Sequence, residues 1–184
     1  KGLLVRRQKG HAGTGNQSFG YFGGGYEPGG QESFVERVDY SNDTATSASK
    51  GPLSAGRQYL AASSSRANAI PLKGPGILEV ATSFGAFSVF TPQGTDFGYF
   101  TGGLSPGNVS TVDRLDYSSD TGTMVTKGPL SVARYGAGSA SNASFGYIAG
   151  GATPNTSIVD RINYSSDTST ALQRGPLTSA KSYV

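Results

Sequence analysis

The chain has 184 residues and a formal net charge of +3, with 28 glycines, a single histidine and no cysteine. Its 15 basic residues are spread along the sequence and form no run, which argues against a nucleic-acid interface. One imidazole and no thiol cannot make a zinc site of the usual ligand types. No apolar stretch reaches the roughly 18 residues of a membrane span. We therefore expect no nucleic acid, no membrane span, no metal and no cofactor.

One sequence pattern occurs three times and decides the architecture. Each copy has an aromatic-Gly-Tyr segment, a Gly-Gly pair, a segment with an acid followed by arginine, an Asp-Thr turn and a closing Gly-Pro-Leu. The last two copies are 47 residues apart, measured from Asp116 to Asn163, whereas Asp39 and Asp116 of the first two are 77 apart. The copies begin at Phe19, Phe97 and Phe145.

Each copy predicts four short strands, as the last copy shows most clearly. We expect strands at 134–141, 145–149, 158–164 and around 170–172, because runs of strand-forming or small residues there are separated by Gly, Pro, Asn and Asp turns. Both faces of 158–164 carry apolar groups, so we expect both faces of this strand to be at least partly covered.

We interpret the chain as one domain, 1–184, made of about four units. The second unit is degenerate and holds about thirty residues more than a regular repeat. It is open whether the extra residues form a decayed half-unit or an inserted hairpin, and whether they carry recognition or only fill space. The units are 1–49, 50–96, 97–126 and 127–184.

The order of these elements resembles the kelch repeat over roughly 19–57, 97–184 and part of 1–18. The resemblance implies an all-β fold, a β-propeller in which each unit is one four-stranded antiparallel blade. The chain departs from the family because it has no Trp, which the fourth strand normally carries. Its sequence motifs Ser-Asn-Asp-Thr and Gly-Pro-Leu-Ser are similar to those in the tandem kelch-like repeats of marine bacteriophage and environmental viral proteins.

The number of blades leaves several assemblies open. The chain closes as a small ring, is a segment of a larger ring or array, or joins other copies to complete one assembly. A solenoid-like stack whose ends need a covering neighbour is the alternative.

Two recurring polar motifs have competing interpretations. The acid or amide pairs spaced by three residues resemble part of a calcium loop but offer only two side-chain ligands each, which favours turn capping. The arginine of each copy is expected to fork to a carboxylate and lock one blade to the next, with ligand binding as the alternative. The pairs are Asp39 and Asp43, Asp116 and Asp120, and Asn163 and Asp167; the arginines are Arg37, Arg114 and Arg161.

The most variable parts of the copies are expected to be loops on one rim, where a rigid scaffold usually carries its binding residues. We predict a binding surface for a protein or glycan there, formed by Tyr26, Glu27, Pro28, Ser105, Pro106, Asn108, Pro154 and Asn155.

The predicted function is a non-enzymatic structural and interaction module, part of a virion appendage or another extracellular assembly. Its partners would be identical or neighbouring subunits, joined through blade edges and rim loops. The alternative is a glycan- or protein-binding propeller for adhesion or host recognition. An enzyme is disfavoured because one histidine and no cysteine leave little for metal or triad chemistry.

Overall fold

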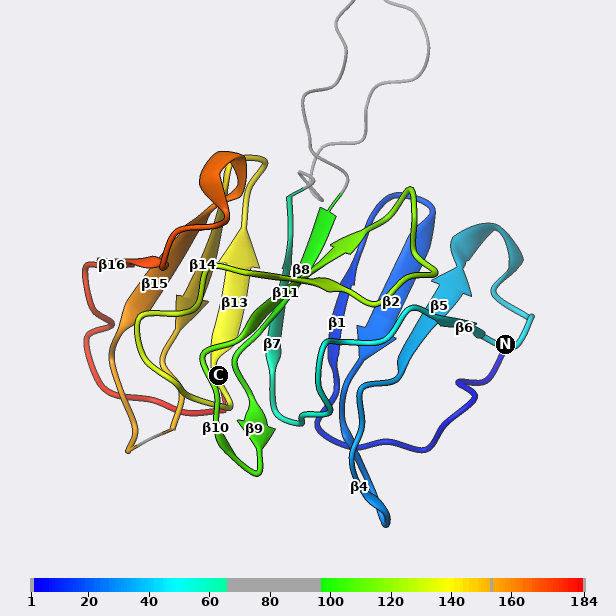
Figure 1. Ribbon diagram of the computed structural model, residues 1–184, viewed down its shortest axis with the longest axis horizontal. Coiled ribbons are helices and arrows are strands. Elements are labelled where there is room, and N and C mark those ends of the chain that lie inside the picture. The colour runs from blue at the N-terminus through cyan, green and yellow to red at the C-terminus, as the bar shows by residue number, and fades with distance from the viewer. Residues whose placement is uncertain (1, 66–96, 153, 184) are drawn as a thin grey trace, which may run out of the picture.

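The computed structural model describes residues 2–65, 97–152 and 154–183 (Figure 1). These residues form an all-β fold of three four-stranded antiparallel sheets and two two-stranded hairpins. The helical elements in the same ranges are two single turns of 3-10 helix, η1 (Tyr40–Asn42) and η2 (Tyr164–Ser166). None of the described helices has the length and apolarity needed to cross a membrane.

Each four-stranded sheet follows the chain from one strand to its hydrogen-bonded neighbour. Sheet 1 contains β1 (Ala12–Gly15), β2 (Phe19–Gly23), β5 (Val35–Asp39) and β6 (Ala48–Lys50). Sheet 2 contains β7 (Ala61–Ser64), β8 (Phe97–Thr101), β11 (Val112–Asp116) and β12 (Val125–Lys127). Sheet 3 contains β13 (Gly138–Ser141), β14 (Phe145–Ala149), β15 (Val159–Asn163) and β16 (Leu172–Arg174). The hairpins are β3 (Tyr26–Glu27) with β4 (Gly30–Gln31), and β9 (Leu104–Ser105) with β10 (Gly107–Asn108).

The four strands expected in the last copy are confirmed in sheet 3. The strand expected at 145–149 coincides with β14, and β15 is one residue shorter at each end than the expected 158–164. The first strand begins later than expected, at Gly138, and the fourth runs on to Arg174.

The division into units differs from the expected one. Strand β7 pairs with β8, so the segment before residue 65 and the segment after residue 97 belong to the same sheet. The expected boundary between 96 and 97 therefore falls inside sheet 2. The extra residues follow β7 in the chain, and the half-unit or hairpin expected there lies outside the described residues.

The three sheets lie side by side in an open row (Figure 1). Their first strands are neighbours, because β7 contacts both β1 and β13. One apolar cluster lies between sheets 1 and 2 and includes Tyr21, Val35 and Phe100. A second lies between sheets 2 and 3 and includes Ile148 and Ile162. Within the described ranges the row does not close into a ring.

Both faces of the middle sheet are covered, whereas the strand for which this was predicted, β15 in sheet 3, has one buried and one half-buried face. Val112 and Leu115 point to opposite faces of β11, and both are buried. In sheet 3, Ile162 is buried against sheet 2, whereas Val159 on the other face is only half-buried. The difference follows from position in the row, because sheet 3 has a described neighbour on one side only.

The Gly-Gly pairs allow successive units to approach closely. Gly102 has a φ of +61°, and a Cβ at that position would lie 2.6 Å from the main-chain oxygen of Arg134. A larger residue would therefore be strained in conformation and would push the next unit away.

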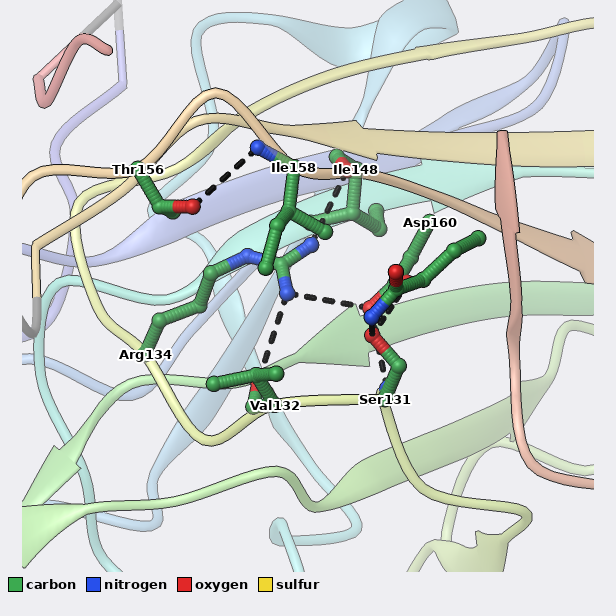
Figure 2. Close-up of polar contacts among 8 residues, drawn as sticks. Ser131, Val132, Arg134, Ile148, Thr156, Ile158 and Asp160 are labelled. Atoms are coloured by element: carbon green, nitrogen blue, oxygen red, sulfur yellow. Dashed lines mark hydrogen bonds and ion pairs between the residues drawn. The ribbon is translucent and has the colours of Figure 1, made fainter. Parts of the chain in front are cut away.

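A buried ion pair anchors the segment that leads into sheet 3. Arg134 lies before β13 and donates from Nη1 to Asp160 at 3.0 Å and from Nη2 to the carbonyl oxygen of Ile148 at 3.0 Å (Figure 2). Both ionic side chains are fully buried. Ser131 also donates to the Asp160 carboxylate, so the buried charge is well paired.

Sheet 2 repeats the arrangement. Arg57 donates from Nη1 to Asp113 at 2.9 Å and from Nη2 to the oxygen of Phe100 at 3.2 Å. Ser54 completes the set by donating to Asp113. Each ion pair thus fixes the chain that enters a sheet to the third strand of that sheet.

We expect Arg134→Met to lower the free energy of unfolding by about 3–5 kcal/mol, because it leaves the Asp160 carboxylate buried without its cation. Urea unfolding followed by circular dichroism measures the change. Lys181→Met is the matched control, since Lys181 holds the same place in the next repeat but is exposed, and it should change stability by less than about 0.5 kcal/mol. The double variant Arg134→Met/Asp160→Leu should recover part of the loss, and a full loss in the double variant would contradict the explanation.

Candidate functional site

Sheets 1 and 2 are joined through the carboxylate of Asp120, which follows β11 in sheet 2. Three donors from sheet 1 converge on it. Tyr21 donates its hydroxyl at 2.9 Å, Arg37 donates from Nη1 at 2.8 Å, and the Nζ of Lys50 lies 3.0 Å away. The donors come from β2, β5 and β6, so one carboxylate ties three strands to the next sheet.

Sheets 2 and 3 are joined by the same set of groups. Asp167 of sheet 3 accepts from Tyr99 at 3.0 Å and from Arg114 at 2.9 Å, and Lys127 lies 3.3 Å away. Hydrogen bonds between charged groups are roughly twice as strong as neutral ones. We call this arrangement of Tyr, Arg and Lys on one sheet and Asp on the next the carboxylate joint.

Ring contacts add to each joint. Tyr21 stacks on Tyr117 with ring centroids 5.1 Å apart, and Tyr99 stacks on Tyr164 at 4.7 Å. In both stacks one ring comes from the sheet that donates and the other from the sheet that carries the aspartate. Aromatic pairs of this kind contribute about 0.5–1.5 kcal/mol beyond the area they bury.

A main-chain hydrogen bond also recurs at each joint. The N–H of Gly51 donates to the carbonyl oxygen of Asp120 at 2.8 Å, and that of Gly128 donates to Asp167 at 2.8 Å. A Cβ on either glycine would collide with the turn that carries the aspartate. The glycine of Gly-Pro-Leu is therefore required by close contact between sheets.

The contacts of the joint and the burial of its side chains shift their pKa values. Burial alone would raise the pKa of Asp120, but hydrogen bonds from Lys50 and Tyr21 and the charges of Arg37 and Lys50 outweigh it, so this pKa lies below its usual value. Burial, followed by the neighbouring carboxylate, raises the pKa of Tyr99. Burial raises the pKa of Tyr164 to about 12. The phenols therefore remain hydrogen-bond donors at neutral pH.

The expectation that the arginines lock successive units is confirmed for Arg37 and Arg114. The third, Arg161, lies over the ring of Phe145, 4.2 Å from its centroid, and forms no ion pair within the described residues. The turn-capping interpretation holds for the first member of each polar pair. Asp39, Asp116 and Asn163 accept from the N–H groups of Ser41, Ser118 and Ser165.

For the second member, turn capping is the wrong interpretation at Asp120 and Asp167, whose side chains reach to the preceding sheet. Sequence reasoning also missed the tyrosine and lysine donors of the joint. The recurrence of Tyr in aromatic-Gly-Tyr and of Lys before Gly-Pro-Leu was the available signal. It did not show which groups would meet in space.

The loops expected on one rim do lie along one edge of the row. Figure 1 shows β4 and the β9–β10 hairpin projecting from the same edge. Tyr26, Glu27 and Pro28 line an open hollow of about 350 Å³, together with Arg7, Gln8 and Lys9. The ammonium group of Lys9 lies over the Tyr26 ring, 5.3 Å from its centroid.

The other predicted loop residues do not line this hollow. Ser105 and Asn108 end the short strands of the second hairpin, with Pro106 exposed between them. Pro154 and Asn155 form an exposed turn before β15. The structure thus places these residues in loops separate from the hollow at Tyr26.

A tyrosine cluster was not expected from the sequence. Tyr59, Tyr135 and Tyr183 form a triangle with centroid separations of 6.1, 5.8 and 6.0 Å. Tyr59 and Tyr183 both have a φ of +55°, which is uncommon for residues other than glycine. They hold the same repeat position as Gly136, so comparing the copies would have marked an unusual backbone there but not the ring contacts.

No protein-family model matches this chain, and no curated protein sequence matches it either.

We expect Asp120→Asn to lower the free energy of unfolding at pH 7 by about 2 kcal/mol, because charge-assisted hydrogen bonds at the joint are lost. The folded-state pKa of Asp120 is lowered, so its contribution is present above the unfolded-state pKa of about 3.9 and is lost as pH falls through the folded value. The difference between wild type and variant should therefore shrink below about pH 4. Urea unfolding as a function of pH measures it.

Asp116→Asn is the matched control, since Asn163 caps the equivalent turn in the third copy. It should change stability by less than about 0.5 kcal/mol. A difference for Asp120→Asn that stays constant down to pH 2 would contradict the ionic explanation.

Proposed function

We propose that the chain is a non-enzymatic structural and interaction module, built from kelch-like β-propeller blades and belonging to a virion appendage or another extracellular assembly. Recurrence of the carboxylate joint is the observation that carries the proposal. Successive sheets are fixed by the same Tyr, Arg, Lys and Asp set, with a stacked tyrosine pair beside it. A unit fixed in this way acts through its rigid shape and through the loops that it exposes to a partner.

The mechanism is rigid display. Buried ion pairs fix the entering segment of sheets 2 and 3, and the joints fix each sheet to the next. The short hairpins then project from one edge of a frame that has little freedom to rearrange (Figure 1). Loops held in this way present a constant surface to a partner without paying the entropy of ordering on contact.

The location of the module is inferred from resemblance. The closing Gly-Pro-Leu-Ser and the Ser-Asn-Asp-Thr turn are similar to kelch-like repeats of marine bacteriophage and environmental viral proteins. In the structure, the Gly-Pro-Leu segment and the turn equivalent to Ser-Asn-Asp-Thr in the next copy meet at the first joint, since Gly51 contacts the turn that carries Asp120. The sequence motifs that suggest a viral source therefore also supply residues that form the contacts between sheets.

A second candidate is a glycan- or protein-binding propeller for adhesion or host recognition. The hollow lined by Tyr26 and Glu27 favours it, because an aromatic ring beside charged groups is typical of surfaces that bind polar ligands. Lys9 and Arg7 give this hollow a mixed charge with Glu27.

Electron microscopy with antibodies raised against the purified chain tests the proposal on native virus particles and cell-surface material. We expect label at regular positions on a particle or fibre, with the chain identified in the same material by mass spectrometry. Antibody depleted on the purified chain is the control. Recovery of the chain only as a free molecule outside any assembly would contradict the structural role and favour the second candidate.

A further inference from the structure

Three tyrosines that the carboxylate joints do not use lie in contact with one another. Tyr59 and Tyr135 precede β7 and β13, the first strands of sheets 2 and 3, and Tyr183 follows β16. The segment 175–183 runs back along sheet 3 toward the middle of the row, which brings Tyr183 to the other two (red in Figure 1). Each ring contacts both of the others, with centroids separated by 5.8 to 6.1 Å.

Main-chain hydrogen bonds fix where these rings lie. The N–H of Tyr59 donates to the oxygen of Gly10 at 2.7 Å, that of Gly136 donates to Tyr59 at 2.8 Å, and that of Tyr183 donates to Gly136 at 2.7 Å. Gly136 thus lies between the two tyrosines in this series, and a Cβ on it would be 3.2 Å from the Tyr183 ring. The missing side chain at residue 136 leaves the space that the Tyr183 ring occupies.

Two of the tyrosines hold their positions in an unfavourable backbone conformation. Tyr59 and Tyr183 both have a φ of +55°, whereas Gly10 and Gly136 hold the same repeat position with φ of +69° and +61°. Residues other than glycine persist in such conformations only where the surrounding structure holds them, and they cluster at functional sites. Glycine is sufficient for this turn, so the two tyrosines indicate a role for the ring contacts themselves.

The cluster differs in exposure from the stacked tyrosines of the joints. The hydroxyls of Tyr21 and Tyr99 donate to aspartates, and their rings are fully buried. Tyr59 and Tyr135 lie in the interior of the sequence and are only half-buried, and Tyr183 is exposed. Partial burial, followed by a hydrogen bond with Tyr135, raises the pKa of Tyr183. Because the ring carbons ortho to the oxygen flank each hydroxyl, the hydrogen bond brings these carbons of the two rings close together.

We propose that Tyr135 and Tyr183 form a site of oxidative coupling, at which a haem peroxidase acting with hydrogen peroxide joins the two phenol rings through a carbon–carbon bond. Each phenol loses one electron and its hydroxyl proton, and the peroxide takes up both electrons and both protons and leaves as two waters. The two phenoxyl radicals form the bond between ring carbons ortho to oxygen, and the proton displaced from each of these carbons returns to the phenol oxygen. Rings that the fold already holds in contact react at a high effective concentration.

The bond acts as a staple in a chain that has no cysteine for a disulfide. Tyr135 and Tyr183 are 48 residues apart, so the bond closes a loop that contains the four strands of sheet 3. A cross-link that closes a loop stabilises the fold chiefly by restricting the unfolded chain. This modification goes beyond the assembly role and stands without it, because the coupled rings belong to one chain.

Oxidation of the purified chain by a haem peroxidase with hydrogen peroxide, followed by peptide mass spectrometry with fragmentation, tests the site. We expect a product in which the peptides that carry Tyr135 and Tyr183 are joined and are lighter than their sum by two hydrogen atoms. Its yield should not depend on protein concentration, and the coupled chain should unfold at a temperature at least about 5 °C higher. Tyr99 and Tyr164 are the internal control, because their centroids are closer, at 4.7 Å, but their burial should keep them uncoupled.

Tyr135→Phe keeps the ring and removes the phenol, so it should abolish both the coupled product and the rise in unfolding temperature. Tyr147→Phe is the matched control, since Tyr147 lies in β14 outside the cluster, and it should leave both unchanged. Equal yields of the product from the intact chain and from the same chain digested before oxidation would overturn the proposal. An intact chain in which Tyr183 stays uncoupled, or couples to Tyr59 instead, would also overturn it.

Discussion

The structure depends on one acidic side chain placed between neighbouring sheets. Asp120 and Asp167 each accept from a tyrosine, an arginine and a lysine of the preceding sheet. Apolar clusters fill the space between the sheets, but apolar packing is not directional and by itself does not fix how one sheet is oriented against the next. A nearly buried carboxylate with three donors adds direction to the contact, because leaving any of these groups without its partner is costly.

The two kinds of ion pair have different tasks. Arg134 with Asp160 is fully buried within one unit and fixes the entering segment to its own sheet (Figure 2). Arg114 with Asp167 is partly exposed on the arginine side and lies between units.

Sheet 1 lacks the buried arginine–aspartate pair that sheets 2 and 3 have within one unit. Glu36 takes the place of the buried aspartate and accepts from the N–H groups of Val5 and Arg6 and from the hydroxyl of Ser47. In sheet 1, main-chain N–H groups therefore pair with the buried carboxylate, as the guanidinium groups of Arg57 and Arg134 do in the later units.

The sequence predicted most of the local structure, because the aromatic-Gly-Tyr segments and the Asp-Thr turns have strong local preferences. Strand β14 and the cross-unit role of Arg37 are examples. The unit boundary was misplaced because β7 has the sequence Ala-Ala-Ser-Ser, which has no strand pattern of its own and forms a strand only by pairing with β8. The tyrosine donors were missed because Tyr21 and Asp120 are 99 residues apart, and only the row of sheets brings them together.

A double-mutant cycle between Arg114 and Asp167 tests most directly whether the joint holds the sheets together. Arg114→Met, Asp167→Asn and the double variant would be compared with wild type by urea unfolding. We expect a coupling free energy of at least about 1 kcal/mol, because the two groups form a close charged hydrogen bond across the sheets. A coupling near zero, with the two single effects adding, would contradict the claim that this carboxylate joins the sheets.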